Sequence, residues 1–284
     1  MRMSVVTPCF NAGKYLAETI EGVLAQTAVR SGRVQLDYWV IDGASRDDTA
    51  AIAERYARDG VKLLSEPDRG MYDALAKGFE RVDGEVCCYI NAGDYHHKAA
   101  FDVVADVMQE QPAVQWLTGM YVIYNERSQV VLAQQPQRIV RSWVRRGLYN
   151  GSARAHIQQE STFWRTPLLK DVDLAELRRW RLAGDFYLWH RFAARHELYI
   201  VESYLGGFKL HAGQLSEQSG RYAAEVQAIC GQPVGVTDRT LALASRVFEK
   251  LSPRRLREAV GYDQVIRWDN TSQSWTLPPG RTAG

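Results

Sequence analysis

The chain has 284 residues, of which 46% are hydrophobic and 24% are charged, and its formal net charge is +2. This composition is typical of a soluble globular protein with a sizeable core, built as one large domain or as a domain with an appendage. The nearly neutral charge balance argues against a protein whose whole surface binds nucleic acid. No run of about 18 apolar residues is present, so the sequence predicts no membrane-spanning helix.

The cysteines show no CxxC spacing, and Cys9, Cys87 and Cys88 fall in or beside predicted buried strands. We interpret them as small buried hydrophobic residues in a reducing compartment rather than as disulfide partners or zinc ligands. No apolar segment of the kind found in signal peptides follows Met1. The sequence therefore predicts a cytoplasmic location, which includes the inner face of the plasma membrane.

Short apolar runs alternate with helical patterns over the first 125 residues, which predicts βαβ units and a mainly parallel sheet. Apolar spacing predicts a helix that ends near Gln26 and another whose N-cap is Asp47 or Asp48. The remaining elements expected in this half are strands at 4–8, 37–41, 61–65, 86–90 and 114–124 and helices at 71–82 and 99–110.

The second half of the chain has a less regular pattern. Its clearest elements are a helix at 185–195 and a strand at 197–202. Residues 216–284 are expected to form a helical C-terminal extension that ends in a loose segment from about Thr271. No internal repeat or low-complexity segment interrupts the chain.

Polar residues follow three of the predicted strands, in segments 7–11, 42–45 and 91–94. Because ligands bind outside the carboxyl ends of the strands in an open α/β sheet, these residues are expected to share one pocket. The sequence thus predicts a binding site of the kind that takes a nucleotide sugar.

Four segments occur in an order and at spacings that resemble family 2 glycosyltransferases with the GT-A fold. They are residues 4–11 (SVVTPCFN), 40–49 (VIDGASRDDT), 66–78 (EPDRGMYDALAKG) and 90–94 (INAGD). Residues 157–165 (IQQESTFWR) and 183–189 (AGDFYLW) resemble acceptor-side segments of a bacterial branch of that family. Each motif alone has little specificity, but the ordered set is specific and covers residues 3–215.

The resemblance implies an α/β protein with the GT-A fold, in which a Rossmann-like, mainly parallel sheet is flanked by helices. Residues 1–215 would form the glycosyltransferase domain, with a nucleotide-sugar half at 1–125 and an acceptor half at 126–215. The extension at 216–284 would then lie outside the catalytic domain and could face a membrane.

The resemblance also implies donor-binding residues. Asp42 is expected to accept hydrogen bonds from the base or ribose, while backbone groups of Thr7, Pro8 and Asn11 face it. The alternative is that Asp42 only caps the turn at 42–45. Arg69 is expected to contact the base or a phosphate, and Asp68 or Asp73 to hold hydroxyls of the donor sugar. Either of these carboxylates could instead form a local ion pair.

Asp94 is expected to bind a divalent cation, Mn²⁺ or Mg²⁺, which prefers carboxylate and phosphate oxygens. The ion would bridge the diphosphate and stabilise the charge that develops as the sugar leaves. Many family members carry a second carboxylate here, whereas this chain has Asn91 and Gly93, so Asn91 would contribute its carbonyl oxygen. The alternative is that Asp94 is a turn residue or a helix cap. His211 is a second candidate ligand, or a structural histidine.

Asp185 is the predicted catalytic base, because it matches the acidic residue that opens this helix in the family. A base must lie within hydrogen-bond reach of the acceptor hydroxyl, and a helix start would hold its carboxylate in a fixed position. An aspartate at a helix N-terminus is also favourable as a cap alone. On the acceptor side we expect Gln159, Glu160 and Trp164, although Trp164 would equally suit the core.

Two basic segments remain. Residues 138–154 carry five arginines and are expected to form a mobile loop that meets a lipid-linked acceptor. Residues 241–256 combine apolar and basic residues as in an interfacial helix on an anionic membrane, or as in an amphipathic helix packed on the domain.

The sequence therefore predicts an inverting, metal-dependent glycosyltransferase. It would move a sugar from a nucleoside diphosphate sugar to a glycan or lipid-linked glycan in bacterial surface polysaccharide synthesis. The alternative is a non-catalytic protein of the same fold that binds a nucleotide sugar or a glycan. The motifs of a Rossmann dehydrogenase, a P-loop NTPase and a serine hydrolase are absent, and nucleic acid is not expected as a partner.

Overall fold

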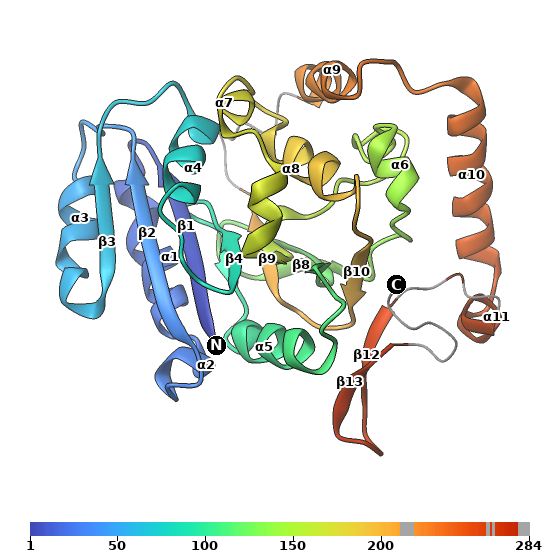
Figure 1. Ribbon diagram of the computed structural model, residues 1–284, viewed down its shortest axis with the longest axis horizontal. Helices are drawn as coiled ribbons and strands as arrows, with labels where there is room; N and C mark the ends of the chain where they lie inside the picture. The colour runs from blue at the N-terminus through green and yellow to red at the C-terminus, as the bar shows by residue number, and fades with distance from the viewer. Residues whose placement is uncertain (211–218, 260–261, 263–264, 278–284) are drawn as a thin grey trace.

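The computed structural model describes residues 1–210, 219–259, 262 and 265–277 (Figure 1). Its centre is a nine-stranded sheet with the strand order β13-β12-β10-β6-β9-β4-β1-β2-β3. The strands are β1 (Arg2–Cys9), β2 (Gln35–Asp42), β3 (Val61–Ser65), β4 (Val86–Tyr89), β6 (Trp116–Thr118), β9 (Thr162–Arg165), β10 (Leu198–Val201), β12 (Val265–Asp269) and β13 (Ser274–Thr276). Neighbouring strands are parallel, except that β9 runs antiparallel to β4 and β6, and β13 antiparallel to β12.

Helices cover both faces of this sheet, and each face buries its own apolar cluster. One face packs against α1 (Gly13–Leu24), α3 (Thr49–Arg55) and α5 (Ala100–Glu110). The other packs against α4 (Met71–Phe79), α6 (Arg141–Arg145), α7 (Leu174–Leu177) and α8 (Gly184–Phe192). The remaining short helices are α2 (Thr27–Arg30), η1 (Ala57–Asp59), η2 (Gln159–Ser161) and η3 (Thr166–Asp171).

A second sheet of four strands has the order β5-β11-β7-β8. Its strands are β5 (Tyr95–His96), β7 (Tyr121–Tyr124), β8 (Val130–Gln134) and β11 (Gly206–Lys209). The single strand expected at 114–124 is therefore two strands in two sheets. The break falls at Gly119, where an added Cβ would lie 2.8 Å from the Ser203 carbonyl oxygen and from the Leu205 side chain.

The C-terminal extension begins with helices α9 (Ser219–Cys230), α10 (Val236–Leu251) and α11 (Arg254–Ala259). It is not helical throughout, because β12 pairs with β10 in the main sheet and β13 closes a hairpin on β12. Ile266 and Trp275 join one apolar cluster, and Val226 and Val265 join the other. The expectation of a loose segment from Thr271 is wrong for residues 274–276, because packing against the edge of the sheet holds them as a strand. Residues 278–284 lie outside the described residues.

The carboxyl ends of β1, β2 and β4 meet at one edge of the main sheet. Cys9 pairs with Asp42, and Val6 pairs with Tyr89. The amide of Ile90 donates to the carbonyl oxygen of Val6 over 3.0 Å, which continues the alignment past the end of β4. This edge therefore gathers the polar segments that follow the three strands, as the sequence predicts.

Candidate active site

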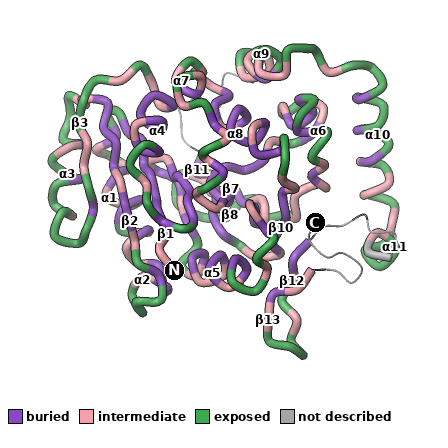
Figure 2. The backbone as a smooth tube through the Cα atoms, viewed as in Figure 1, coloured by how far each residue is buried: buried purple, intermediate pink, exposed green. Residues whose placement is uncertain are grey.

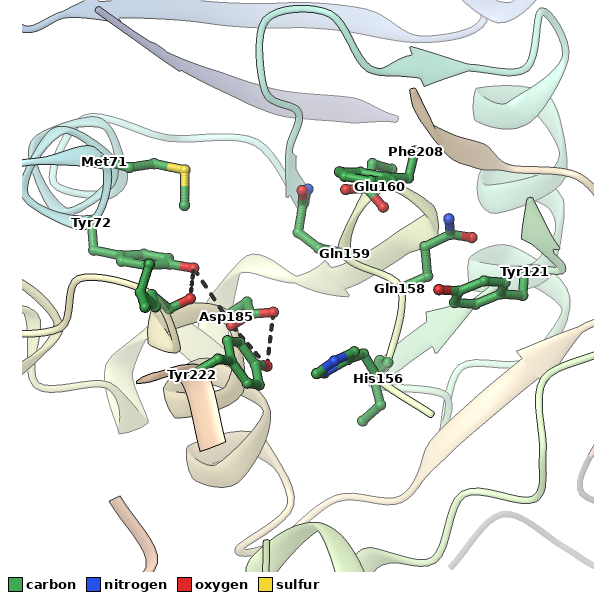
Figure 3. A pocket seen from close by; sticks show the side chains of 12 residues that line it. Met71, Tyr72, Tyr121, His156, Gln158, Gln159, Glu160, Asp185, Phe208 and Tyr222 are labelled. Atoms are coloured by element: carbon green, nitrogen blue, oxygen red, sulfur yellow. Dashed lines mark hydrogen bonds between the residues drawn. The ribbon is translucent and has the colours of Figure 1, made fainter. Parts of the chain in front are cut away.

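A cavity of about 210 Å³ opens where α4, α8, α9 and the second sheet approach the segment before β9. In Figure 3, Tyr72, Asp185 and Tyr222 lie on one side, and Gln158, Glu160 and Tyr121 lie on the other. The remaining lining residues are Met71, His156, Ile157, Gln159, Leu182 and Phe208. The cavity thus combines carboxylates, amides and aromatic rings, the groups that hold a polar ligand in a fixed orientation.

Asp185 points into this cavity from the first turn of α8. Its carboxylate accepts from the Phe186 amide over 2.7 Å and from the hydroxyl of Tyr222, which lies 3.2 Å from each carboxylate oxygen. The Tyr72 hydroxyl is 3.5 Å from Oδ1. Burial raises the pKa of Asp185 to about 7, although these hydrogen bonds lower it. The N-cap position of α8 is Ala183, and Asp185 lies in the first turn, where its carboxylate also satisfies the Phe186 amide. The favourable helix-end role that was its alternative therefore accompanies its place in the cavity, and its role as base stays a prediction.

Helix α9 fixes the backbone just before Asp185. The Glu225 carboxylate accepts from the amides of Leu182 and Ala183, both over 2.9 Å, and from the Arg181 amide over 3.2 Å. Gly184 is required next to this bend, because a Cβ there would lie 2.4 Å from the Tyr72 ring. The position of Asp185 therefore depends on a carboxylate and a hydroxyl from the C-terminal extension.

Asp94 and Glu160 form a pair of neighbouring buried carboxyl groups, with 4% and 6% of their surface exposed. Burial raises the pKa of Asp94 to about 7, although the Lys209 amide donates to Oδ1 over 3.0 Å and opposes this shift. The pKa of Glu160 lies well above its usual range because of burial and of the negative charge of Asp94. Two carboxyls in such contact are held together by a shared proton or by a cation.

Asn91 follows β4 and contacts the Asp94–Glu160 pair through Asp94. Its side-chain amide donates to Asp94 over 3.3 Å and to Gln159 over 3.2 Å. The Oδ1 atom of Asn91 is buried and accepts no hydrogen bond. An unsatisfied amide oxygen beside two carboxyls fits the oxygen preference of Mg²⁺ or Mn²⁺. Among the described residues, however, no cluster of three or more Asp, Glu, His or Cys side chains surrounds one point.

Gly206 of β11 allows this part of the site to close. An added Cβ would lie 2.0 Å from the carbonyl oxygen of Glu160, so only glycine lets the second sheet pack against η2. Of the predicted acceptor residues, Gln159 and Glu160 line the cavity. His211, the second candidate metal ligand, lies outside the described residues.

Trp164 does not lie on the acceptor side of this cavity. It is fully buried in β9, between the rings of Tyr89 and Phe192 at 6.4 and 5.6 Å. Trp164 pairs with Trp116 of β6, and both rings lie on the face of the sheet that α8 covers. Side chains alternate between the two faces along a strand, so this face and not the opposite one receives Trp164. The alternative interpretation of Trp164 as a core residue is the one that the structure supports.

Asp42 lies at the end of β2 and is fully buried. It accepts from the Ser45 amide over 3.1 Å and from the Ser65 hydroxyl over 2.6 Å. The Ser45 contact is that of the turn-capping alternative, and the Ser65 contact joins β2 to β3. Its role toward a donor stays a prediction, with its carboxylate held at the sheet edge where the donor is expected.

Thr7 and Pro8 are not in a facing loop, because both lie within β1 and are buried. The Thr7 hydroxyl hydrogen bonds to that of Tyr38 over 2.9 Å, inside the sheet. Asn11 does lie in the loop, with a positive φ of 49°. Its amide donates to the Ser45 hydroxyl, and its side-chain oxygen accepts from the Arg46 amide over 2.9 Å. Asn11 thus links the loops that follow β1 and β2.

Asp68 lies against the turn at 42–45. A Cβ added at Gly43 would lie only 2.5 Å from Oδ2 of Asp68. Burial raises the pKa of Asp68. Asp73 instead is enclosed, since it accepts from Arg69 Nε over 3.2 Å and from Arg178 Nε over 3.0 Å. The structure therefore shows the local ion pair that was the alternative for Arg69 and Asp73. Asp68 lies beside the turn at 42–45 and accepts from the Gly70 amide over 2.8 Å, and its role toward a donor stays a prediction.

Sequence reasoning missed Tyr72, Tyr222, Glu225 and His156. Tyr72 lies within the segment at 66–78 that carries the family resemblance, so that motif was a usable signal. His156 lines the cavity and packs its ring 4.7 Å from that of Tyr222. No local pattern marks Tyr222 or Glu225, because their contacts reach 37 to 44 residues back along the chain.

The family model described as "Glycosyl transferase family 2" matches residues 4–170, more than half of the chain. An uncharacterized glycosyltransferase of Nostoc sp. is 21% identical over 239 residues, which cover 80% of this chain and 73% of the relative. One from Mycobacterium tuberculosis is 32% identical over 107 residues, 38% of each chain. Poly(ribitol-phosphate) beta-N-acetylglucosaminyltransferase TarS of Staphylococcus aureus is 22% identical over 79% of this chain and 36% of its own.

Solved glycosyltransferase structures share the fold. TarS residues 1–349 in complex with UDP-GlcNAc superpose with a TM-score of 0.60 at 14% identity, over 91% of this chain and 76% of that one. Glucosyl-3-phosphoglycerate synthase from Mycobacterium tuberculosis, in complex with Mn²⁺, UDP and phosphoglyceric acid, superposes with a TM-score of 0.54 at 18% identity, over 82% and 79%. The predicted GT-A fold is thereby confirmed. Taken with the family match, these findings mean that the chain belongs to glycosyl transferase family 2, whose members transfer a sugar from a nucleotide sugar.

Proposed function

We propose that this enzyme transfers a sugar from a nucleoside diphosphate sugar to a hydroxyl of a glycan or lipid-linked glycan, with inversion at the anomeric carbon. One observation carries the proposal. A carboxyl group with a pKa of about 7, Asp185, shares a cavity with Glu160, which contacts Asp94. A base with a pKa near 7 can take the proton of the acceptor hydroxyl. A cation held by the Asp94–Glu160 pair can neutralise the negative charge of the leaving diphosphate.

Asp185 acts as the base in this proposal. The acceptor oxygen forms a bond to the anomeric carbon, the bond from that carbon to the diphosphate oxygen breaks, and the acceptor proton passes to the Asp185 carboxylate. Tyr222 and Glu225 fix the carboxylate in place, and the apolar walls of the cavity raise its proton affinity to a useful range.

Asp94, Glu160 and Asn91 would hold the divalent cation, Mn²⁺ or Mg²⁺. When bound, the cation neutralises charge on the diphosphate as the sugar leaves. The three side chains fit it because two are carboxyls in contact and the third has a buried oxygen without a donor. The raised pKa values of Asp94 and Glu160 mean that protons must leave these carboxyl groups before a cation binds.

The donor would lie between this pair and the edge formed by Asn11, Asp42 and Asp68. We propose a uridine nucleotide, since the related structures of TarS and of glucosyl-3-phosphoglycerate synthase contain UDP-GlcNAc and UDP. Asp42 and Asp68 carry acceptor oxygens that suit the hydroxyls and ring nitrogens of a nucleoside.

The acceptor would enter along the side lined by Tyr121, His156 and Gln158. Aromatic rings beside amides suit the alternating apolar and hydroxyl faces of a sugar. We propose a bacterial surface polysaccharide as its source, because the similar proteins include TarS and a putative teichuronic acid biosynthesis glycosyltransferase of Bacillus subtilis.

The test is thermal stability against UDP, GDP, dTDP and CDP, each with and without Mn²⁺. A ligand at about one hundred times its dissociation constant should stabilise the fold by about 2.7 kcal/mol. We expect a Mn²⁺-dependent shift with UDP alone. A larger shift with another nucleotide would replace the uridine proposal, and no shift with any of them would contradict nucleotide binding at this site.

A further inference from the structure

Helix α10 packs on the body of the protein through a polar face. Asp238 pairs with Arg146, and Glu249 accepts from Arg154 over 2.7 Å. The Ser245 hydroxyl also accepts from Arg154 over 3.0 Å. Arg154 is fully buried. Two of the five arginines expected in a mobile loop, Arg146 and Arg154, therefore anchor α10 instead.

The opposite face of α10 is apolar and exposed. Val236, Leu243, Val247 and Leu251 expose 83, 61, 48 and 75% of their surface. Their spacings of seven, four and four residues place them on one stripe at about 3.6 residues per turn. Figure 2 shows the helix buried on the side toward the body and exposed on the outer side. A helix that buries its polar residues and exposes its apolar ones is the reverse of an ordinary surface helix.

Basic residues flank this stripe. Arg239 and Lys250 lie next to it on α10, and Arg255 follows on α11; all three are exposed. In the part of the chain that the structure describes, no ion pair engages any of them. The two acidic residues of α10, Asp238 and Glu249, both turn inward to arginines. The outer face of α10 is therefore apolar and positively charged, without a compensating acid.

We propose that the outer face of α10, formed by Val236, Leu243, Val247 and Leu251 with Arg239 and Lys250, binds an anionic lipid surface. An apolar stripe can enter the boundary between head groups and acyl chains, while flanking cations bind the lipid phosphates. Among the described residues no helix is both long and apolar enough to span a bilayer.

A second copy of the chain fits this face less well than a lipid surface does. Two such faces packed together would bring unpaired basic residues of one copy near those of the other. A helix of 16 residues is about 24 Å long. One stripe of that length is small beside the ~1,200–2,000 Å² that stable protein interfaces bury.

The structure also changes the set of residues that the sequence predicts for membrane contact. Phe248 packs its ring 5.0 Å from that of Tyr262. Arg246 donates to the carbonyl oxygens of Ser152 and Ala153, and Arg254 pairs with Glu202 at 3.4 Å. Phe248, Arg246 and Arg254 are thus engaged by contacts within the chain, whereas Leu243 and Arg239 are exposed on the outer face.

The test is sedimentation of the full chain with vesicles of phosphatidylcholine alone and of phosphatidylcholine with one-third phosphatidylglycerol. We expect binding to the anionic vesicles only.

The L243Q/V247Q/L251Q variant should bind at least tenfold more weakly. R239Q/K250Q should lose about fivefold per charge, since each basic residue contributes that much near such a surface. The matched control is V130Q/V131Q on β8, whose two side chains are also exposed, at 53 and 56%; it should bind as the wild type does.

Three results would overturn the proposal: equal loss in the β8 control, no binding of the wild type to anionic vesicles, or a self-association in sedimentation velocity that the L243Q/V247Q/L251Q variant abolishes. The last result would assign the face to a second copy. Because the substituted side chains are exposed, the thermal midpoint should not change, which separates lost binding from unfolding. Asp185→Asn should bind vesicles normally, so failure of the proposed sugar transfer would leave this test intact.

Discussion

The hydroxyl of Tyr222 lies 3.2 Å from both carboxylate oxygens of Asp185. Because this contact stabilises the charged form, it lowers a pKa that burial raises to about 7. Helix α9 is therefore part of the candidate active site, although it lies beyond the residues that the family model matches. Substitutions in α9 should alter the chemistry itself.

Tyr222→Phe should move the pH dependence of activity. In the wild type, kcat/KM should rise with pH and level off above about 7, as Asp185 loses its proton. Loss of a hydrogen bond to a charged group costs about 1.5 kcal/mol, so the variant's midpoint should lie about one unit higher. The measurement is kcat/KM from pH 5 to 9. An unchanged midpoint with uniformly lower activity would mean that Tyr222 is only structural.

Glu225→Ala should lower kcat roughly tenfold, because three backbone amides before Asp185 lose their shared acceptor. Glu225→Gln keeps an acceptor oxygen and should restore most of the rate. Glu176→Ala removes an exposed pair with Arg179 and is the matched control. Equal kcat values for Glu225→Ala and the wild type would refute a positioning role.

Asp185→Asn should lower the rate at least about 10²-fold, because an amide cannot take the proton of the acceptor hydroxyl. Nucleotide binding should be unchanged. Donor binding is measured by the thermal shift with nucleotide and Mn²⁺. Loss of both turnover and binding would place Asp185 in the donor site instead.

The same substitution should stabilise the folded chain at pH 8. The folded pKa of Asp185, about 7, lies above its unfolded value of about 3.9. Between about pH 3.9 and about pH 7, the two pKa values, the folded state thus binds one more proton at Asp185 than the unfolded state does. The contribution of Asp185 to the free energy of unfolding therefore falls as the pH rises through this range. Asp185→Asn removes that dependence and should raise Tm by a few degrees at pH 8 and little at pH 4. An equal Tm change at both pH values would contradict the raised pKa.

Asp94→Asn should abolish the part of the nucleotide-induced stabilisation that requires Mn²⁺, up to about 2.7 kcal/mol at saturating ligand. The variant removes one negative charge from the pair with Glu160. Thermal shifts with UDP, with and without Mn²⁺, give the readout, and Asp171→Asn, in a surface pair with Arg195, is the control. Retention of the full Mn²⁺ effect would locate the cation elsewhere.

Trp164→Phe should reduce stability by about 1–2 kcal/mol without a change in acceptor KM, because the ring is fully buried among Tyr89, Trp189 and Phe192. Urea unfolding and acceptor titration measure the two effects. A raised KM at unchanged stability would restore the acceptor role.

The sequence by itself determined the central fold and the places where its polar groups occur. The strand at 61–65 has the predicted bounds, Asp42 lies at the end of β2, and Asp94 lies in the segment after β4. These features depend on apolar spacing and on residue types within a few positions, which act locally. The order and spacing of the motifs also indicated the family, because one arrangement of strand ends requires polar segments at these distances along the chain.

Only the tertiary structure decided which polar groups meet. Glu160 contacts Asp94 because β9 inserts antiparallel between β4 and β6, and Tyr222 reaches Asp185 because α9 packs on α8. The periodicity of α10 defines two stripes, but Arg146 and Arg154 determine that the polar stripe faces inward. Contacts of this kind join distant segments, and their energies depend on packing and burial that no local pattern of residues contains.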